Sequence, residues 1–106
     1  MAKKTTKIAA KSARPYVIVR TYSAGCFAGR LVKRVGKEAV IQQARRLWYW
    51  TGAATLSQLA QEGTSKPAQC KFPAAVDEIT VTEAIEVLRV TPLAQASIEG
   101  VPVWRA

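Results

Sequence analysis

The chain has 106 residues, a formal net charge of +9, no His and two Cys. This length predicts one small domain with a modest core, and the lack of His removes the commonest general base and transition-metal ligand. No apolar run approaches the ~18 residues of a membrane span, and no apolar stretch follows the first lysines. We therefore expect a protein made in the cytoplasm, without a secretory signal and without membrane contact.

The charge is unevenly distributed along the chain. Residues 1–46 contain twelve basic residues and one acidic residue, whereas residues 47–106 contain four basic and six acidic ones. This asymmetry predicts an anionic partner, which is nucleic acid, a phosphate-bearing ligand or an acidic protein surface. The simpler interpretation is that the excess charge keeps a small domain soluble.

The first fourteen residues differ in composition from the rest. They contain five basic residues, no acidic residue and a single large aliphatic one, Ile8. Such a segment cannot bury enough apolar surface to fold alone, so we predict a basic flexible arm over residues 1–14 and a single domain over residues 15–106. The basic residues of the arm are candidates for binding the partner: Lys3, Lys4, Lys7, Lys11 and Arg14.

Several β-prone segments follow Pro15. Residues 16–22 are dense in β-branched and aromatic residues and predict a strand. The glycines of residues 25–29 predict a tight turn or a strand whose backbone passes close to another. Residues 30–35 and 38–44 flank Gly36-Lys37 and predict a hairpin, and residues 46–50 are expected to add a third antiparallel strand.

The second half of the chain predicts two short helices. The first begins after Thr55, with Gln58 completing a capping box, and ends at Gly63. The second begins at Thr91-Pro92 and ends at Gly100. Between them, residues 79–90 predict β structure with a bulge or break near Ala84. The expected fold class is α+β, with a mostly antiparallel sheet or small open β-barrel and two short helices.

The central run ARRLWYWTGAATLSQLA, residues 44–60, resembles an uncharacterised family of small proteins encoded by tailed bacteriophages and prophages. Four later features fit the same pattern: Pro67, Cys70-Lys71-Phe72, Ile85-Glu86-Val87 and Ser97-Ile98. The resemblance covers Pro15 to Trp104 and departs from the family pattern at Cys26, where an aliphatic residue is expected. It implies a phage genome as the origin, and it brings no functional residues with it.

The same run places two arginines directly before three aromatic residues. If residues 46–50 form a strand, Arg46, Trp48 and Trp50 share one face, whereas Arg45 lies on the other. Such a face can hold a phosphate while a base stacks on an indole, or it can anchor a protein interface. The remaining alternative is that both Trp side chains belong to the core. Arg45, Arg46, Trp48 and Trp50 are therefore further candidate partner-binding residues.

No motif in the chain predicts catalysis. Residues 25–30 lack the spacing of a phosphate-binding loop, and the hydroxyl side chains have no His to activate them. Cys26 and Cys70 lie far apart without a CxxC motif, so we expect reduced thiols, with a disulfide as the alternative in an oxidising compartment. We expect no enzyme activity, no metal and no cofactor.

These observations favour a non-enzymatic phage structural or assembly protein, such as a capsid decoration or minor virion protein, that docks by its basic arm and its Arg/Trp face. Its partners would be other phage structural proteins or copies of itself in a homo-oligomer. It would be found in the host cytoplasm when made and then in the virion. The alternative is a binding module for nucleic acid or an anionic nucleotide, as in an anti-defence or regulatory phage protein.

Overall fold

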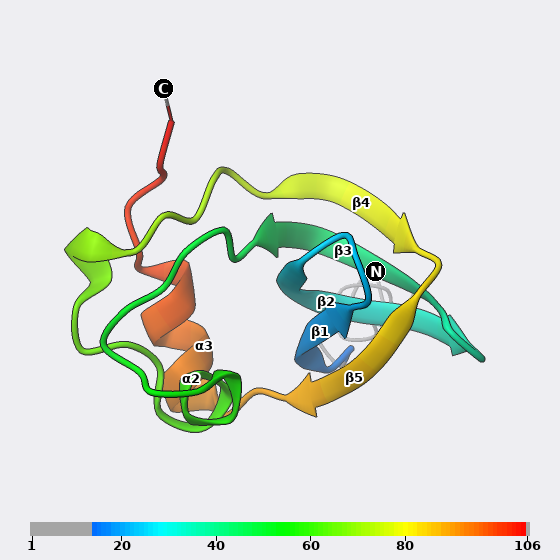
Figure 1. Cartoon of the computed structure of the whole chain (residues 1–106), viewed down its shortest axis with the longest axis horizontal. Helices are drawn as coiled ribbons and strands as arrows, with labels where there is room; N and C mark the ends of the chain where they lie inside the picture. The colour runs from blue at the N-terminus through cyan, green and yellow to red at the C-terminus, as the bar shows by residue number, and fades with distance from the viewer. Residues whose placement is uncertain (1–13, 106) are drawn as a thin grey trace, which may run out of the picture.

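The computed structural model describes residues 14–105, which form an antiparallel sheet with two helices at one end (Figure 1). The five strands are β1 (Tyr16–Thr21), β2 (Cys26–Val35), β3 (Glu38–Arg46), β4 (Val76–Val81) and β5 (Ala84–Arg89). The helices are α2 (Leu56–Glu62) and α3 (Pro92–Glu99), and a 3-10 turn, η1 (Pro67–Gln69), lies between α2 and β4. The sheet is not closed, and the expected α+β fold class is confirmed. No helix in residues 14–105 is long and apolar enough to cross a membrane.

The sheet is strongly curled. Its strand order is β4-β3-β2-β1-β5, so β4 and β5 lie at opposite edges although only two residues separate them in the chain. Figure 1 shows β4 turning directly into β5 at one end of the molecule. The link is held there because Tyr22 N–H donates to the Glu83 carbonyl (3.0 Å) and Ala84 N–H donates to the Lys37 carbonyl (2.8 Å). The break predicted near Ala84 is confirmed, and it separates the two edge strands.

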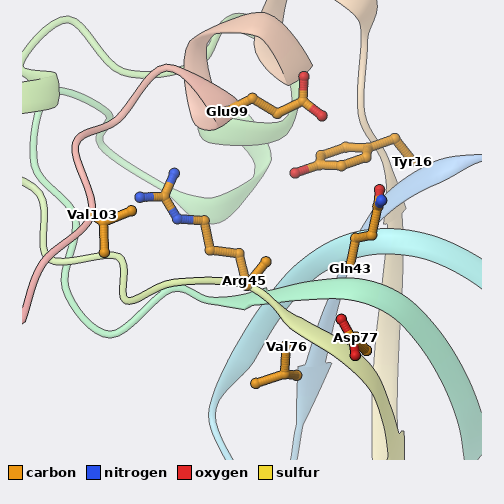
Figure 2. A pocket seen from close by; sticks show the side chains of 8 residues that line it. Tyr16, Gln43, Arg45, Val76, Asp77, Glu99 and Val103 are labelled. Carbon is orange, nitrogen blue, oxygen red and sulfur yellow. The ribbon is translucent and has the colours of Figure 1, made fainter.

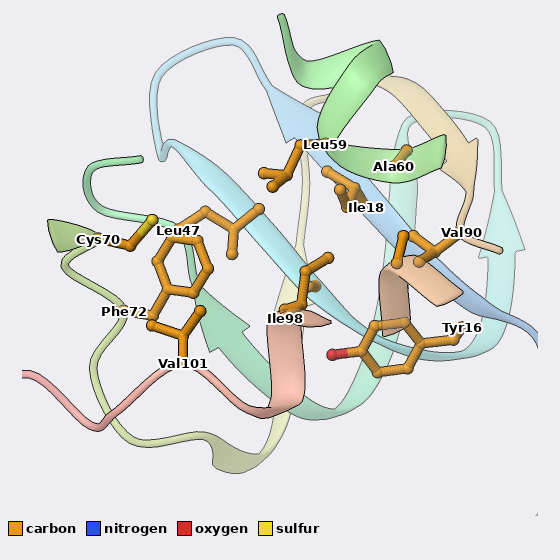
Figure 3. Packing of buried hydrophobic residues seen from close by; sticks show 12 residues of the cluster. Tyr16, Ile18, Leu47, Leu59, Ala60, Cys70, Phe72, Val90, Ile98 and Val101 are labelled. Carbon is orange, nitrogen blue, oxygen red and sulfur yellow. The ribbon is translucent and has the colours of Figure 1, made fainter. Parts of the chain in front are cut away.

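Strand β1 is buried on both of its faces. Val17 and Val19 belong to a core cluster enclosed by the curled sheet, whereas Tyr16 and Ile18 belong to a second cluster beneath the helices. Figure 3 shows this second cluster, where Ile18 packs among side chains from α2, α3 and the segment around Phe72. The dense run of large residues in β1 follows from this double burial, since a strand with no solvent face shows no polar alternation.

The predicted hairpin and the predicted close backbone approach are both confirmed. Strands β2 and β3 pair across Gly36-Lys37, and Gly36 has the positive φ of 58° that the turn requires. Gly29 lies inside β2, where an added Cβ would come within 2.7 Å of the Gln42 carbonyl oxygen. A side chain at this position would therefore push β2 and β3 apart.

Both predicted helices begin and end where their caps predict. The Thr55 side chain accepts a hydrogen bond from the Gln58 N–H (3.1 Å), and Gly63 closes α2 with φ 79°. Thr91 caps the start of α3 in the same way, and Gly100 caps its end. The hydroxyls satisfy main-chain donors that the first turn leaves unpaired.

The predicted strand over residues 46–50 is wrong. Strand β3 ends at Arg46, and the following segment makes only one isolated bridge, from Tyr49 to Lys71. The reason is the length of the neighbouring strand: β2 begins at Cys26, whose carbonyl accepts from the Leu47 N–H (2.9 Å). Beyond this hydrogen bond the chain has no partner on β2, so it leaves the sheet.

Candidate functional site

Three segments that are distant in sequence meet outside the main sheet. Tyr49 forms an antiparallel bridge with Lys71, and Phe72 forms a parallel bridge with Val103. The Lys71 N–H donates to the Tyr49 carbonyl (2.8 Å), and the Trp104 N–H donates to the Phe72 carbonyl (3.0 Å). The chain after β3, the segment after η1 and the C-terminal segment therefore form a small ribbon.

Exposed aromatic side chains gather on this ribbon around one lysine. The Lys71 ammonium nitrogen lies 5.8 Å from the centre of the Tyr49 ring and 5.6 Å from that of Trp104. Tyr49 is 50% exposed, Trp104 41%, and the adjacent Trp48 64%. We call Tyr49, Lys71 and Trp104 the aromatic surface.

This surface has the chemistry of a docking site. Exposed aromatic residues carry a large apolar area, and Trp and Tyr are enriched among the residues that dominate binding energy at protein interfaces. A lysine between two rings gains about 0.5–1 kcal/mol at an exposed site and keeps its charge available to an acidic group. The aromatic surface can therefore bind apolar and acidic groups together.

Arg45 lies inside the fold. It is 6% exposed, and its guanidinium lies 5.5 Å from the centre of the Phe72 ring. It donates hydrogen bonds to four main-chain carbonyls, those of Phe72 (3.0 Å), Pro73 (2.9 Å), Ile98 (2.8 Å) and Val101 (2.6 Å). Burial lowers the pKa of Arg45, and Tyr16 acts in the opposite direction. The side chain joins the end of α3 and the segment after η1 to β3.

The structure also separates Arg46, Trp48 and Trp50. Arg46 is half-buried, donates to the Ala24 carbonyl (2.6 Å) and lies 4.4 Å from the centre of the Phe27 ring. Trp50 is half-buried and packs against the core beneath the helices, whereas Trp48 is mostly exposed. The shared face expected from strand alternation is not formed, because these residues continue beyond the end of β3.

Arg14 is attached to the sheet. Its guanidinium donates to the Gln42 side chain (2.6 Å), and its carbonyl accepts from the Arg30 guanidinium (2.9 Å). The other candidate residues of the arm, Lys3, Lys4, Lys7 and Lys11, lie outside the described residues. Their part in binding stays a prediction.

Sequence reasoning missed Lys71 and Trp104 as members of one surface. Neither residue belongs to a helix or strand that the sequence predicts. The one available signal is the presence of a Trp in a short terminal segment where few other large residues can bury it. The contact of Trp104 with Lys71 depends on tertiary pairing.

A second surface is formed by cations at the β2–β3 hairpin. Lys33, Arg34 and Lys37 are exposed. Within residues 14–105 the one ion pair joins Arg20 to Glu86 (2.8 Å), so these three charges face solvent without a carboxylate partner there. The hairpin therefore presents three exposed cations to solvent, with Glu38 as the acidic residue of the same hairpin.

The described part of the chain contains two free thiols and several carboxylates. Cys26 and Cys70 are free thiols, half-buried and buried respectively. Burial raises the pKa of Cys26 against the opposing effect of Arg20, so the thiol form dominates at neutral pH. Among residues 14–105, no group of three or more Cys, Asp and Glu side chains is placed to hold a metal ion.

Comparison with protein families gives one match, whereas neither the curated proteins nor the solved structures contain a match to the chain. Residues 14–98 match the model of a family described as Domain of unknown function (DUF6948). These residues include the whole sheet and nearly all of α3. Because the match spans most of the chain, the protein belongs to this family of unknown function.

Proposed function

We propose that the chain is a non-enzymatic structural or assembly protein encoded by a bacteriophage, and that it docks through the aromatic surface onto an acidic protein neighbour. The observation that carries this proposal is the placement of two exposed aromatic side chains, Tyr49 and Trp104, around Lys71. The resemblance to small phage and prophage proteins supports the origin. The neighbour is another structural protein of the particle.

The chemistry of the neighbour follows from the charges around the aromatic surface. Lys71 lies between the rings, and Arg105 follows Trp104 in the chain. The net charge of +9 attracts an acidic partner over longer distances and increases the rate of encounter. An acidic surface with an apolar centre is therefore the best complement.

Incorporation into particles tests this role. Phage particles are purified from induced bacteria that encode the chain, and the chain is quantified in them by mass spectrometry. Replacing both Tyr49 and Trp104 by Ser should lower incorporation at least about tenfold, because interface Trp and Tyr side chains commonly contribute about 2 kcal/mol or more. Tyr22→Ser is the matched control, since Tyr22 is 78% exposed and lies outside the aromatic surface.

Two results would contradict the proposal. One is a wild-type chain absent from purified particles and monomeric in solution by light scattering. The other is a folded double variant that enters particles as well as the wild type. Circular dichroism of each variant separates loss of docking from loss of folding.

The alternative role, a binding module for nucleic acid or an anionic nucleotide, is favoured by the cations at the β2–β3 hairpin. If the hairpin binds phosphates, the logarithm of affinity for DNA or RNA should fall linearly with the logarithm of salt concentration. Replacing Lys33, Arg34 and Lys37 by Gln should then reduce this slope by ~0.9 for each phosphate that the hairpin no longer neutralises. Absence of measurable binding to DNA, RNA or cyclic nucleotides at low salt would exclude this role.

A further inference from the structure

A cleft of about 420 Å³ lies between the sheet and the end of α3 (Figure 2). Its polar lining consists of Tyr16, Gln43, Arg45, Asp77 and Glu99. Apolar side chains of the segments at residues 75–76 and 103 complete it. Ligand sites in proteins commonly have volumes of roughly 300–1,000 Å³ with a few polar groups among apolar ones, and this cleft fits that description.

An irregularity in β3 forms one side of the cleft. Gln42 pairs with Glu78 and Ala44 with Val76, so Gln43 lies opposite Asp77. Gln43 has φ 52° and is the one non-glycine residue with a positive φ among residues 14–105. Such a conformation costs of order 1–3 kcal/mol and is found mainly where the surrounding structure imposes it.

The Tyr16 hydroxyl has no hydrogen-bond partner in the described part of the chain. Tyr16 is 6% exposed, and Figure 2 shows its hydroxyl directed into the cleft toward Arg45. Every fully buried polar side-chain atom in residues 14–105 has a hydrogen-bond partner. The unpaired hydroxyl oxygen is therefore open to the cleft, as a donor and acceptor held in place by a buried ring.

The lining of the cleft carries two carboxylates and one guanidinium, a formal charge of −1 that favours a cation. Arg30 lies 5.4 Å from the centre of the Tyr16 ring but outside the lining. Glu99 lies beside the Tyr16 ring in Figure 2, and Asp77 lines the opposite wall. Arg45 is also in the lining, but four main-chain carbonyls accept its hydrogen bonds, including those of Ile98 and Val101 at the end of α3. The C-terminal end of a helix carries partial negative charge, which offsets the guanidinium.

The pKa of Tyr16 reflects these neighbouring charges. Burial, with Glu99 as the second cause, raises the pKa of Tyr16 to about 12, whereas Arg45 and Arg30 act in the opposite direction. The hydroxyl is therefore protonated at neutral pH, and its oxygen lone pairs can accept a hydrogen bond from a cationic donor. This agrees with the geometry, in which an acceptor and two carboxylates surround the same cleft.

We propose that the cleft binds the cationic side chain of a lysine or arginine presented by a partner protein. The cationic head lies between the Tyr16 hydroxyl and the Glu99 carboxylate, with Asp77 as a second acidic neighbour. The alkyl stem packs along Val76 and Val103, which are 50% and 45% exposed. Val103 directly precedes Trp104 in the chain, so a protein docked on the aromatic surface places its side chains next to the cleft.

The inference does not depend on the proposed docking role, because small probes can test the cleft alone. Argininamide is titrated into the full-length chain and followed by NMR, with citrullinamide as the neutral probe of the same shape. Argininamide should saturate shifts at Gln43, Asp77 and Glu99 in the millimolar range, and citrullinamide should bind about tenfold more weakly, since it cannot form the charge-assisted hydrogen bond.

Variants assign the binding to the named groups. Glu99→Gln and Tyr16→Phe, each checked for folding, should weaken argininamide binding about tenfold and a few-fold respectively. Glu38→Gln is the matched control, because Glu38 is an exposed carboxylate of β3 that does not line the cleft. Its affinity for argininamide should equal that of the wild type.

A short peptide tests whether the cation can come from a protein. A blocked Ala-Arg-Ala peptide should bind to the same residues, and its citrulline analogue should bind more weakly. The proposal is overturned if argininamide produces no saturable shifts at the cleft, if citrullinamide binds equally well, if Glu99→Gln has no effect, or if the peptide is excluded.

Discussion

Arg45 is a single buried residue that holds one end of this fold together, because its guanidinium donates only to main-chain carbonyls. Arg45 donates to the carbonyls of Phe72, Pro73, Ile98 and Val101, and so joins three segments of the chain. Arginine suits this position because its planar group presents five N–H donors in a fixed arrangement, whereas lysine has three on a single nitrogen.

Replacement of Arg45 by Met should destabilise the fold strongly. Methionine keeps an unbranched stem but provides no donor, so several inward-facing carbonyls lose their partners at once. Since each such loss costs about 1–3 kcal/mol, the free energy of unfolding measured by urea denaturation should fall by at least about 3 kcal/mol. Arg34→Met, at an exposed position of the hairpin, should change it by less than about 0.5 kcal/mol. Equal effects of the two variants would contradict the structural role of Arg45.

Ionisation of Tyr16 makes the free energy of unfolding depend on pH in the alkaline range. Its pKa is raised from 10.0 to about 12 in the folded chain, so the folded state holds this proton more tightly than the unfolded state. The resulting stabilisation is fully present below pH 10.0 and is lost as the pH rises through about 12. The full loss corresponds to about 2–3 kcal/mol.

Chemical denaturation across this pH range measures the effect. Tyr16→Phe should flatten the decrease, because phenylalanine has no proton to lose. Tyr22→Phe is the control, since Tyr22 is 78% exposed. A Tyr16→Phe profile that keeps the wild-type decrease above pH 10.0 would show that another group causes it.

The close contact between strands β2 and β3 depends on the absence of a side chain at Gly29. Gly29→Ala places a Cβ 2.7 Å from both the Gln42 carbonyl oxygen and the Ile41 Cγ2 atom. The backbone must shift, so thermal or urea unfolding should show a loss of about 1–3 kcal/mol. Gly36→Asn should be nearly neutral, because no atom lies within 4 Å of an added Cβ there and Asn tolerates a positive φ. If Gly29→Ala were as stable as the wild type, the strand contact would be looser than described.

At the scale of the whole molecule, residues 14–105 contain both core clusters and every strand partner described above. Arg14 is the first residue with a side-chain contact in this set, through Gln42. Removal of residues 1–13 should therefore leave a cooperative fold whose free energy of unfolding changes by less than about 0.5 kcal/mol.

The same truncation tests the role of the arm, because it removes four lysines. If these lysines contribute to docking, the truncated chain should fold yet enter particles less efficiently. A matched chain in which the four lysines are replaced by Gln separates the effect of charge from that of length. If both variant chains enter particles as efficiently as the wild type, the arm does not contribute to docking.

Features that depend on residues close together in the chain could be predicted from the sequence. The hairpin at Gly36-Lys37, the helix caps Thr55 and Thr91 and the break near Ala84 could all be predicted, since local backbone preferences and short-range hydrogen bonds decide them. The fold class could be predicted for the same reason. Residues 46–50 could not, because aromatic β-prone residues extend past the point where β2 supplies a partner.

Tertiary packing selects which side chains enter the core and which face solvent. Two adjacent arginines look equivalent in sequence, yet Arg45 is buried among carbonyls and Arg46 closes a turn over Phe27. Tyr49 and Trp104 both lie near Lys71 because the segment of Lys71 and Phe72 pairs with the segments of both aromatic residues. Such contacts join residues far apart in the chain, and burial depends on what covers a side chain, which local sequence does not record.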